Sequence, residues 1–167
     1  MYRLRVFYEK KGISKFISHK NLCKIIERAL RRIDFPFKFS EGYSPHTRIS
    51  FASPLPVNII GLNEVFEVYT IKKIEIQEFL EKVNLLLPEG IKFLKAEWVE
   101  NLSSLNDLIE TAIYKIKKEQ NLEIERIRSL GKVIEENIDF IKIEIPIKNF
   151  NHKNFLGYKE IERTLIL

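Results

Sequence analysis

Two of the chain's three histidines flank a basic segment, and their side chains could act on a phosphodiester. His19 opens a stretch rich in Lys and Arg, and His46 follows Pro45 in a loop that also holds Gly and Ser. Two imidazoles within reach of one phosphate could serve as acid and base in metal-free RNA cleavage, while Lys20 stabilises the charged transition state. The same histidines could instead order turns through hydrogen bonds. Both interpretations stay open, because the sequence does not show whether His19 and His46 approach each other.

The basic segment predicts an anionic partner. Residues 1–60 hold 12 Lys and Arg against 4 Asp and Glu, whereas the remainder holds 16 against 19. Lys20 falls in the first turn of a predicted helix, where the helix dipole disfavours positive charge, so an anion at the free N–H groups would explain it. A solvated charged face is the alternative for most of these residues. The candidate nucleic-acid-binding residues are Lys15, His19, Lys20, Lys24, Arg28, Arg31, Arg32, Tyr43, His46 and Arg48.

The motifs of several common sites are missing from the sequence. It has no His-x-x-x-His or Cys-x-x-Cys pair for a metal and no glycine-rich phosphate loop. Cys23 is the single cysteine, which excludes internal disulfides and clusters held by several thiolates of this chain. No apolar run is long enough to cross a bilayer. We therefore expect a cytoplasmic chain with neither a metal nor a cofactor of its own and with no membrane partner.

The elements that must position these residues follow from hydrophobic periodicity. Alternation over residues 2–8 predicts a strand, and helical spacing over 19–33 predicts a helix with Ser18 as its N-cap. Strands are expected over 47–53, 64–71 and 91–99, and a second helix over 75–87. The order β-α-β-β-α-β is that of a ferredoxin-like unit, in which both helices cover one face of an antiparallel sheet.

The uncovered face of that sheet is a second candidate surface. If Tyr2, Leu4, Val6 and Tyr8 lie under the helices, the other face shows Arg3, Arg5 and Phe7, joined by Arg48 and Tyr69. Arginine beside exposed aromatic rings is how RNA-binding sheets hold phosphates and stack bases. The alternative is that the C-terminal half of the chain packs over this face.

Residues after 100 predict a smaller unit. A short helix over 103–109, a strand over 111–117, a helix over 122–130 and a strand over 140–147 are expected, and residues 148–167 are not placed. With 167 residues the chain fits one compact domain or two small ones. The fold class is therefore α+β, with a ferredoxin-like domain over 1–100 and a smaller α+β extension over 101–167 that could pack on it.

Four sequence strings carry a family resemblance. They are Lys15-Phe16-Ile17-Ser18-His19-Lys20-Asn21-Leu22, Glu27-Arg28-Ala29-Leu30-Arg31-Arg32, Phe39-Ser40-Glu41-Gly42-Tyr43-Ser44-Pro45-His46 and Ile49-Ser50-Phe51-Ala52-Ser53-Pro54-Leu55-Pro56. Over roughly the first 100 residues the chain resembles the radical SAM-linked protein family, a bacterial domain of unknown function. Its members are fused to, or encoded beside, radical SAM proteins that often bind cobalamin. The shared positions are His19, Arg28, Arg31, Arg32, Ser40, Gly42, Tyr43, Pro45, His46, Ser50, Pro54 and Pro56.

The resemblance implies a partner with an iron–sulfur cluster, which this chain with one cysteine cannot hold. Weaker family positions are Ala112-Ile113-Tyr114 and Ile161-Glu162-Arg163-Thr164. Our leading hypothesis is a non-catalytic accessory module that binds an anionic substrate, RNA by expectation, and presents it to a radical SAM protein. The alternatives are a metal-free endoribonuclease using His19, His46 and Lys20, or a protein–protein adaptor.

Overall fold

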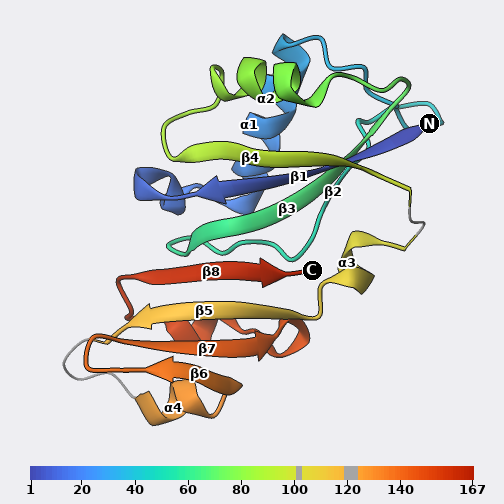
Figure 1. Ribbon diagram of the computed structural model, residues 1–167. Helices are drawn as coiled ribbons and strands as arrows, with labels where there is room; N and C mark the ends of the chain where they lie inside the picture. Colours follow the sequence, from blue (N-terminus) through green and yellow to red (C-terminus); the bar gives the residue numbers. More distant parts are fainter. Residues whose placement is uncertain (101–102, 119–123) are drawn as a thin grey trace.

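The chain folds around one eight-stranded sheet (Figure 1). In the computed structural model, which describes residues 1–100, 103–118 and 124–167, the strand order is β4-β1-β3-β8-β5-β7-β6, with β2 also beside β3. All these pairings are antiparallel except that of β3 with β8. The strands are β1 (Tyr2–Lys10), β2 (Ile49–Phe51), β3 (Ile60–Thr70), β4 (Ile91–Val99), β5 (Thr111–Lys117), β6 (Lys132–Glu136), β7 (Phe140–Pro146) and β8 (Ile161–Ile166).

Four described helices accompany the sheet. They are α1 (His19–Arg32), α2 (Ile76–Asn84), α3 (Leu105–Leu108) and α4 (Ile124–Arg128). Helix α1 begins where predicted, because the side chain of Ser18 accepts a hydrogen bond from the backbone N–H of Asn21. None of the described helices has both the length and the apolar character needed to cross a membrane.

The first hundred residues contain the predicted order of strands and helices. Leu4 and Val6 of β1 are fully buried and Tyr8 almost so, in a cluster with the apolar stripe of α1 and with α2, as the alternation predicted. Tyr2, expected on the same buried side, is instead 43% exposed at the start of the strand. Strand β3 begins four residues earlier than expected, at Ile60. Its first residues pair with both β1 and β8, and no local pattern could reveal those long-range partners.

The C-terminal part extends the same sheet instead of forming a separate one. Strand β5 has its predicted bounds and β7 ends one residue early, whereas β6 and β8 were not predicted. Part of the expected helix over 122–130 lies outside the described residues. Strand β8 inserts between β3 and β5, so the end of the chain joins the two parts, as Figure 1 shows near its centre.

Candidate nucleic-acid interface

Helix α1 presents the predicted basic residues to solvent. Its buried stripe is Leu22, Ile26, Ala29 and Leu30, and the side chains of Lys20, Lys24, Arg28, Arg31 and Arg32 are exposed. Arg31 forms an ion pair with Glu27 at 2.7 Å, and its guanidinium lies 5.6 Å from the ring centroid of Phe37. The Arg31 side chain is therefore partly occupied by contacts within the chain.

The other predicted residues before and after α1 lie on separate segments. The Lys15 side chain is bound to the C-terminal part of the chain, because its Nζ donates to the carbonyl of Lys159 at 3.2 Å. Tyr43 and His46 are exposed in the loop before β2, where the His46 N–H donates to Ser40 Oγ at 2.9 Å. The loop therefore exposes both side chains, and neither has a described side-chain partner on α1.

An open hollow of about 490 Å³ lies between α1 and β2, and we call it the α1–β2 groove. His19, Cys23 and Glu27 line it from one side of α1, since residues four apart on a helix share a face. The segment around β2 contributes Thr47, Ile49, Ser50, Phe51, Ala52 and Pro54. The structure therefore brings the start of α1 to the segment after the loop. The lining residues include neither Lys20 nor His46.

His19 is held in a neutral, half-buried setting. Its Nε2 lies 3.5 Å from Cys23 Sγ, and its ring meets that of Phe51 edge-on at 5.1 Å. Its Nδ1 is buried without a hydrogen-bond partner among the described residues. Burial lowers the pKa of His19, and the charges of Lys10 and Arg163 lower it further. Burial is thus the largest cause of the lowered pKa.

A buried charged pair lies near His19. Arg163 of β8 is fully buried, and its Nε donates to Glu64 Oε1 of β3 at 2.9 Å. Its Nη2 also donates to the carbonyl of Ser53 at 3.0 Å. Sequence reasoning noted Arg163 only as a weak family position and missed Glu64. A signal existed, because Arg163 takes an inward position between Ile161 and Leu165 of an alternating strand.

A second hollow, of about 440 Å³, lies where β1 begins and β3 and β4 end, and we call it the aromatic–basic hollow. The guanidinium of Arg48 lies 4.6 Å from the ring centroid of Tyr69. Lys73 Nζ lies 5.6 Å from the ring centroid of Tyr2 and 5.9 Å from that of Trp98. The full lining is Met1, Tyr2, Arg3, Arg48, Tyr69, Lys73, Trp98, Val99 and Glu100.

Only part of this hollow was predicted. Arg3, Arg48 and Tyr69 were expected together on the uncovered face of the sheet, and the structure brings all three to the hollow. Lys73 and Trp98 were not among the predicted residues. No local signal shows Trp98 as a site residue, because its place beside β1 depends on the register of β4.

The prediction that Arg5 and Phe7 are displayed is wrong. Arg5 is 8% exposed and pairs with Glu67 at 2.8 Å. Phe7 packs against the hydrophobic cluster that contains the C-terminal strands. At Phe7 the alternative interpretation is correct, because the C-terminal half of the chain packs over this face of the sheet.

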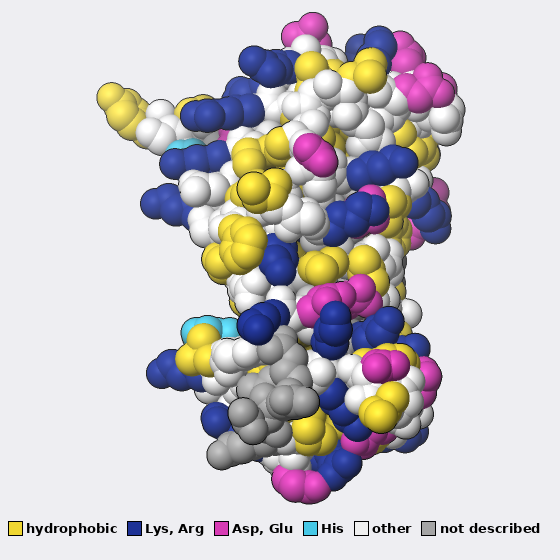
Figure 2. All heavy atoms as spheres, turned by 90° about the vertical axis from the view of Figure 1, so that its left-hand side faces the viewer, with side chains coloured by type: hydrophobic (Ala, Val, Ile, Leu, Met, Phe, Trp, Pro, Cys, Tyr) yellow, Lys and Arg dark blue, Asp and Glu magenta, His cyan; other side chains and the backbone are white. Residues whose placement is uncertain are grey.

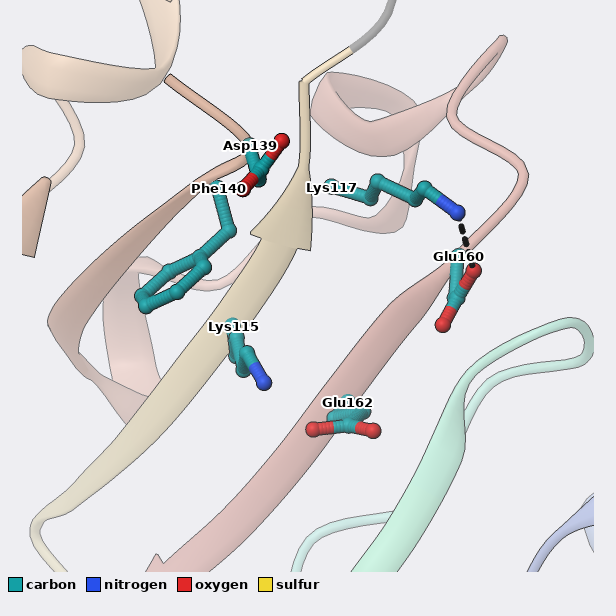
Figure 3. A pocket seen from close by; sticks show the side chains of 6 residues that line it. All are labelled: Lys115, Lys117, Asp139, Phe140, Glu160 and Glu162. Atoms are coloured by element: carbon teal, nitrogen blue, oxygen red, sulfur yellow. Dashed lines mark hydrogen bonds and ion pairs between the residues drawn. The ribbon is translucent and has the colours of Figure 1, made fainter. Parts of the chain in front are cut away.

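A third hollow, of about 180 Å³, lies on the C-terminal part of the sheet (Figure 3). Lys117 pairs with Glu160 at 3.2 Å, and Lys115 lies 4.8 Å from the ring centroid of Phe140 and opposite Glu162 in the strand register. Such cross-strand pairs are the ordinary means of stabilising an exposed sheet face. The lysines of this hollow are thus occupied by neighbours.

Positive charge is not confined to one patch. Figure 2 shows Lys and Arg side chains on both the upper and the lower parts of one face, with acidic side chains among them. The distinctive feature of the aromatic–basic hollow is therefore the combination of cations with rings. The described residues contain no group of three or more His, Cys, Asp or Glu side chains that could hold a metal ion.

Comparison with known proteins gives one family match. The family model described as "Uncharacterized protein conserved in bacteria (DUF2344)" matches residues 3–154. No curated protein matches the chain. The matched region contains every lining residue of the α1–β2 groove and all but Met1 and Tyr2 of the aromatic–basic hollow.

Proposed function

From the premise that the chain belongs to an uncharacterized family conserved in bacteria (DUF2344), we propose that it is a non-catalytic accessory module that binds single-stranded RNA. The observation that carries the proposal is the aromatic–basic hollow, where three cations and three aromatic rings share one open site. Arg48 and Lys73 would contact phosphates, whereas Arg3 already pairs with Glu67 at 3.4 Å and donates to the carbonyl of Ser103 at 3.0 Å.

The chemistry of the hollow suits unpaired bases. Proteins recognise single-stranded RNA by stacking its bases on aromatic side chains and on guanidinium planes. Each stacked base contributes about 1–3 kcal/mol. Tyr69, already covered by Arg48, offers a ring and a guanidinium plane together. The exposed cations of α1 would add electrostatic attraction that does not depend on sequence.

The geometry lends less support to a ribonuclease. Lys20 and His46 do not line the α1–β2 groove, and His19 Nδ1 is shielded from solvent. The described part of the groove therefore contains one imidazole, whereas acid–base cleavage needs two groups at the same phosphate.

The proposal also includes a partner protein. We propose that the module presents RNA to a radical SAM protein, on the strength of the resemblance carried by the strings around His19 and His46. The iron–sulfur cluster would belong to that partner. We also assign residues 1–100 to the ferredoxin-like class, because β4, β1, β3 and β2 follow one another with α1 and α2 as the connections.

Binding of a fluorescently labelled ten-nucleotide RNA at several salt concentrations tests the function. Two phosphate contacts, from Arg48 and Lys73, predict a log–log salt slope of about −1.4. Replacing Tyr69 with Leu should weaken binding roughly 5- to 150-fold, which corresponds to one lost stacking contact of about 1–3 kcal/mol. Lys117→Ala, which changes an exposed cation of the third hollow, is the matched control. Binding that ignores salt, or a Tyr69→Leu variant that binds like the wild type, would contradict the proposal.

A further inference from the structure

The outer edge of β2 is unpaired. The N–H of Tyr69 donates to the carbonyl of Arg48, and the N–H of Ala52 donates to that of Val65. Hydrogen-bonding direction alternates along an antiparallel strand, so the backbone groups of Phe51 face away from β3. No other described strand pairs with β2.

This free edge borders the α1–β2 groove. The β2 side of its lining is a nearly continuous run of residues, and the opposite side is the His19, Cys23 and Glu27 row of α1. A helix beside a free strand edge leaves room for one extended chain, which would bond to the strand with its backbone and place alternate side chains against the helix.

The charges around the groove indicate which kind of extended chain would bind there. Glu27 is the only acidic side chain among the described lining residues, and Arg31 pairs with it at 2.7 Å. Lys20 and Lys24 are exposed and do not line the groove; each lies about 100° around the helix from the groove-lining His19 or Cys23. An acidic chain in the groove would therefore meet positive charge at its rim on the α1 side.

We infer that the α1–β2 groove docks an extended acidic segment of a partner protein, which pairs with β2 as an added strand. Main-chain bonds to Phe51 and to the carbonyl of Ile49 supply the affinity, because the Ile49 N–H already donates to the carbonyl of Thr47 at 3.2 Å. Lys20 and Lys24 supply the preference for acidic side chains. The groove and the aromatic–basic hollow share no lining residue, although Thr47 and Ile49 of the groove flank Arg48 of the hollow. Since β2 has three residues, only a few such bonds form.

Amide hydrogen exchange measured by NMR tests the docking mode. The probe is an acetylated decapeptide of alternating Val and Glu, and its counterpart carries Lys in place of Glu. The Phe51 amide should exchange at least about tenfold more slowly when the acidic peptide is saturating. The Ala52 amide already donates to Val65 at 3.3 Å and serves as the internal control. The lysine peptide should bind at least several-fold more weakly.

A charge-reversed variant completes the test. Lys24→Glu should weaken binding of the acidic peptide several-fold, whereas Lys92→Glu on the exposed face of β4 should leave it unchanged. The inference is overturned if the acidic peptide does not bind at millimolar concentration, or if it binds without slowing exchange at Phe51. Equal affinity for both peptides also overturns it. Protection of Phe51 by a ten-nucleotide RNA but not by the peptide would assign the groove to nucleic acid instead.

Discussion

Lys10 is a buried cation without a carboxylate of its own. The side chain is fully buried, and its Nζ donates to the carbonyl of Ile17 at 2.9 Å. The nearby carboxylate of Glu64 is bound to Arg163. Burial lowers the pKa of Lys10 to about 8, and Glu64 only partly opposes this. The charged form of Lys10 therefore costs free energy in the folded state.

This cost predicts a pH dependence of stability. Below pH 8 Lys10 is protonated in both states and the full cost is present. As the pH rises from about 8 towards the unfolded value of 10.5, the folded state releases its proton first, so the free energy of unfolding increases. Urea unfolding between pH 7.5 and 9 should show the wild type gaining stability relative to Lys10→Met. Lys11→Met is the control, and parallel curves for wild type and Lys10→Met would contradict the prediction.

A substitution at Arg48 can distinguish the contribution of positive charge to RNA binding from that of the planar guanidinium. Its guanidinium stacks on Tyr69, and a lysine would keep the charge without the flat surface. We expect Arg48→Lys to retain the salt slope of wild-type binding and to lose affinity a few-fold. Titration of labelled RNA at three salt concentrations measures both quantities. A reduced slope would contradict the prediction, because it would mean that the lysine no longer reaches a phosphate that the arginine contacts.

Among the elements, α1 positions the groove, and its N-terminus depends on one side chain. Ser18 Oγ accepts a hydrogen bond from the Asn21 N–H at 3.4 Å, and His19 follows it immediately. The cap therefore sets where the helix begins and how His19 meets Phe51.

Removing this cap should cost stability. Ser18→Ala should lower the free energy of unfolding by about 1 kcal/mol, whereas Ser18→Gly should cost only a few tenths. Urea denaturation of both variants measures the difference. Equal effects of the two substitutions would show that the hydroxyl contributes something other than capping.

At the scale of the whole molecule, the pair of Arg163 and Glu64 connects β8 to β3. The two residues are 99 positions apart and both are buried. The parallel pairing of these strands is where the C-terminal part of the sheet continues the N-terminal part. The pair therefore lies at the junction between the two parts of the molecule.

A double-mutant cycle tests this junction. Arg163→Met or Glu64→Gln alone should destabilise the chain by about 3–5 kcal/mol, because each leaves a buried charge unpaired. The double variant should cost clearly less than the sum of the single variants. Equilibrium unfolding in urea provides the three differences. Additive effects would mean that the two side chains do not stabilise each other.

The local hydrophobic pattern predicted most of the helices and strands, but little of what surrounds the candidate site residues. Strands β4 and β5 have their expected bounds, because alternation along each strand is written into consecutive residues. Strand β6 was missed because it carries no clean alternation, and its Val133 and Ile134 are both exposed. Lys10 and Arg163 help to lower the pKa of His19, and no local pattern could place those two charges near it.

Consecutive residues were enough to predict which side of the first strand packs inward at Leu4, Val6 and Tyr8, the start of α1 at Ser18 and the basic first third. The meeting of Arg3, Arg48 and Tyr69 with Trp98 in one hollow, and the joining of the two parts of the sheet by β8, followed only from the folded chain. The physical reason is the range of the interactions. Periodicity and capping act between residues a few positions apart, whereas strand register and burial depend on partners a hundred positions away.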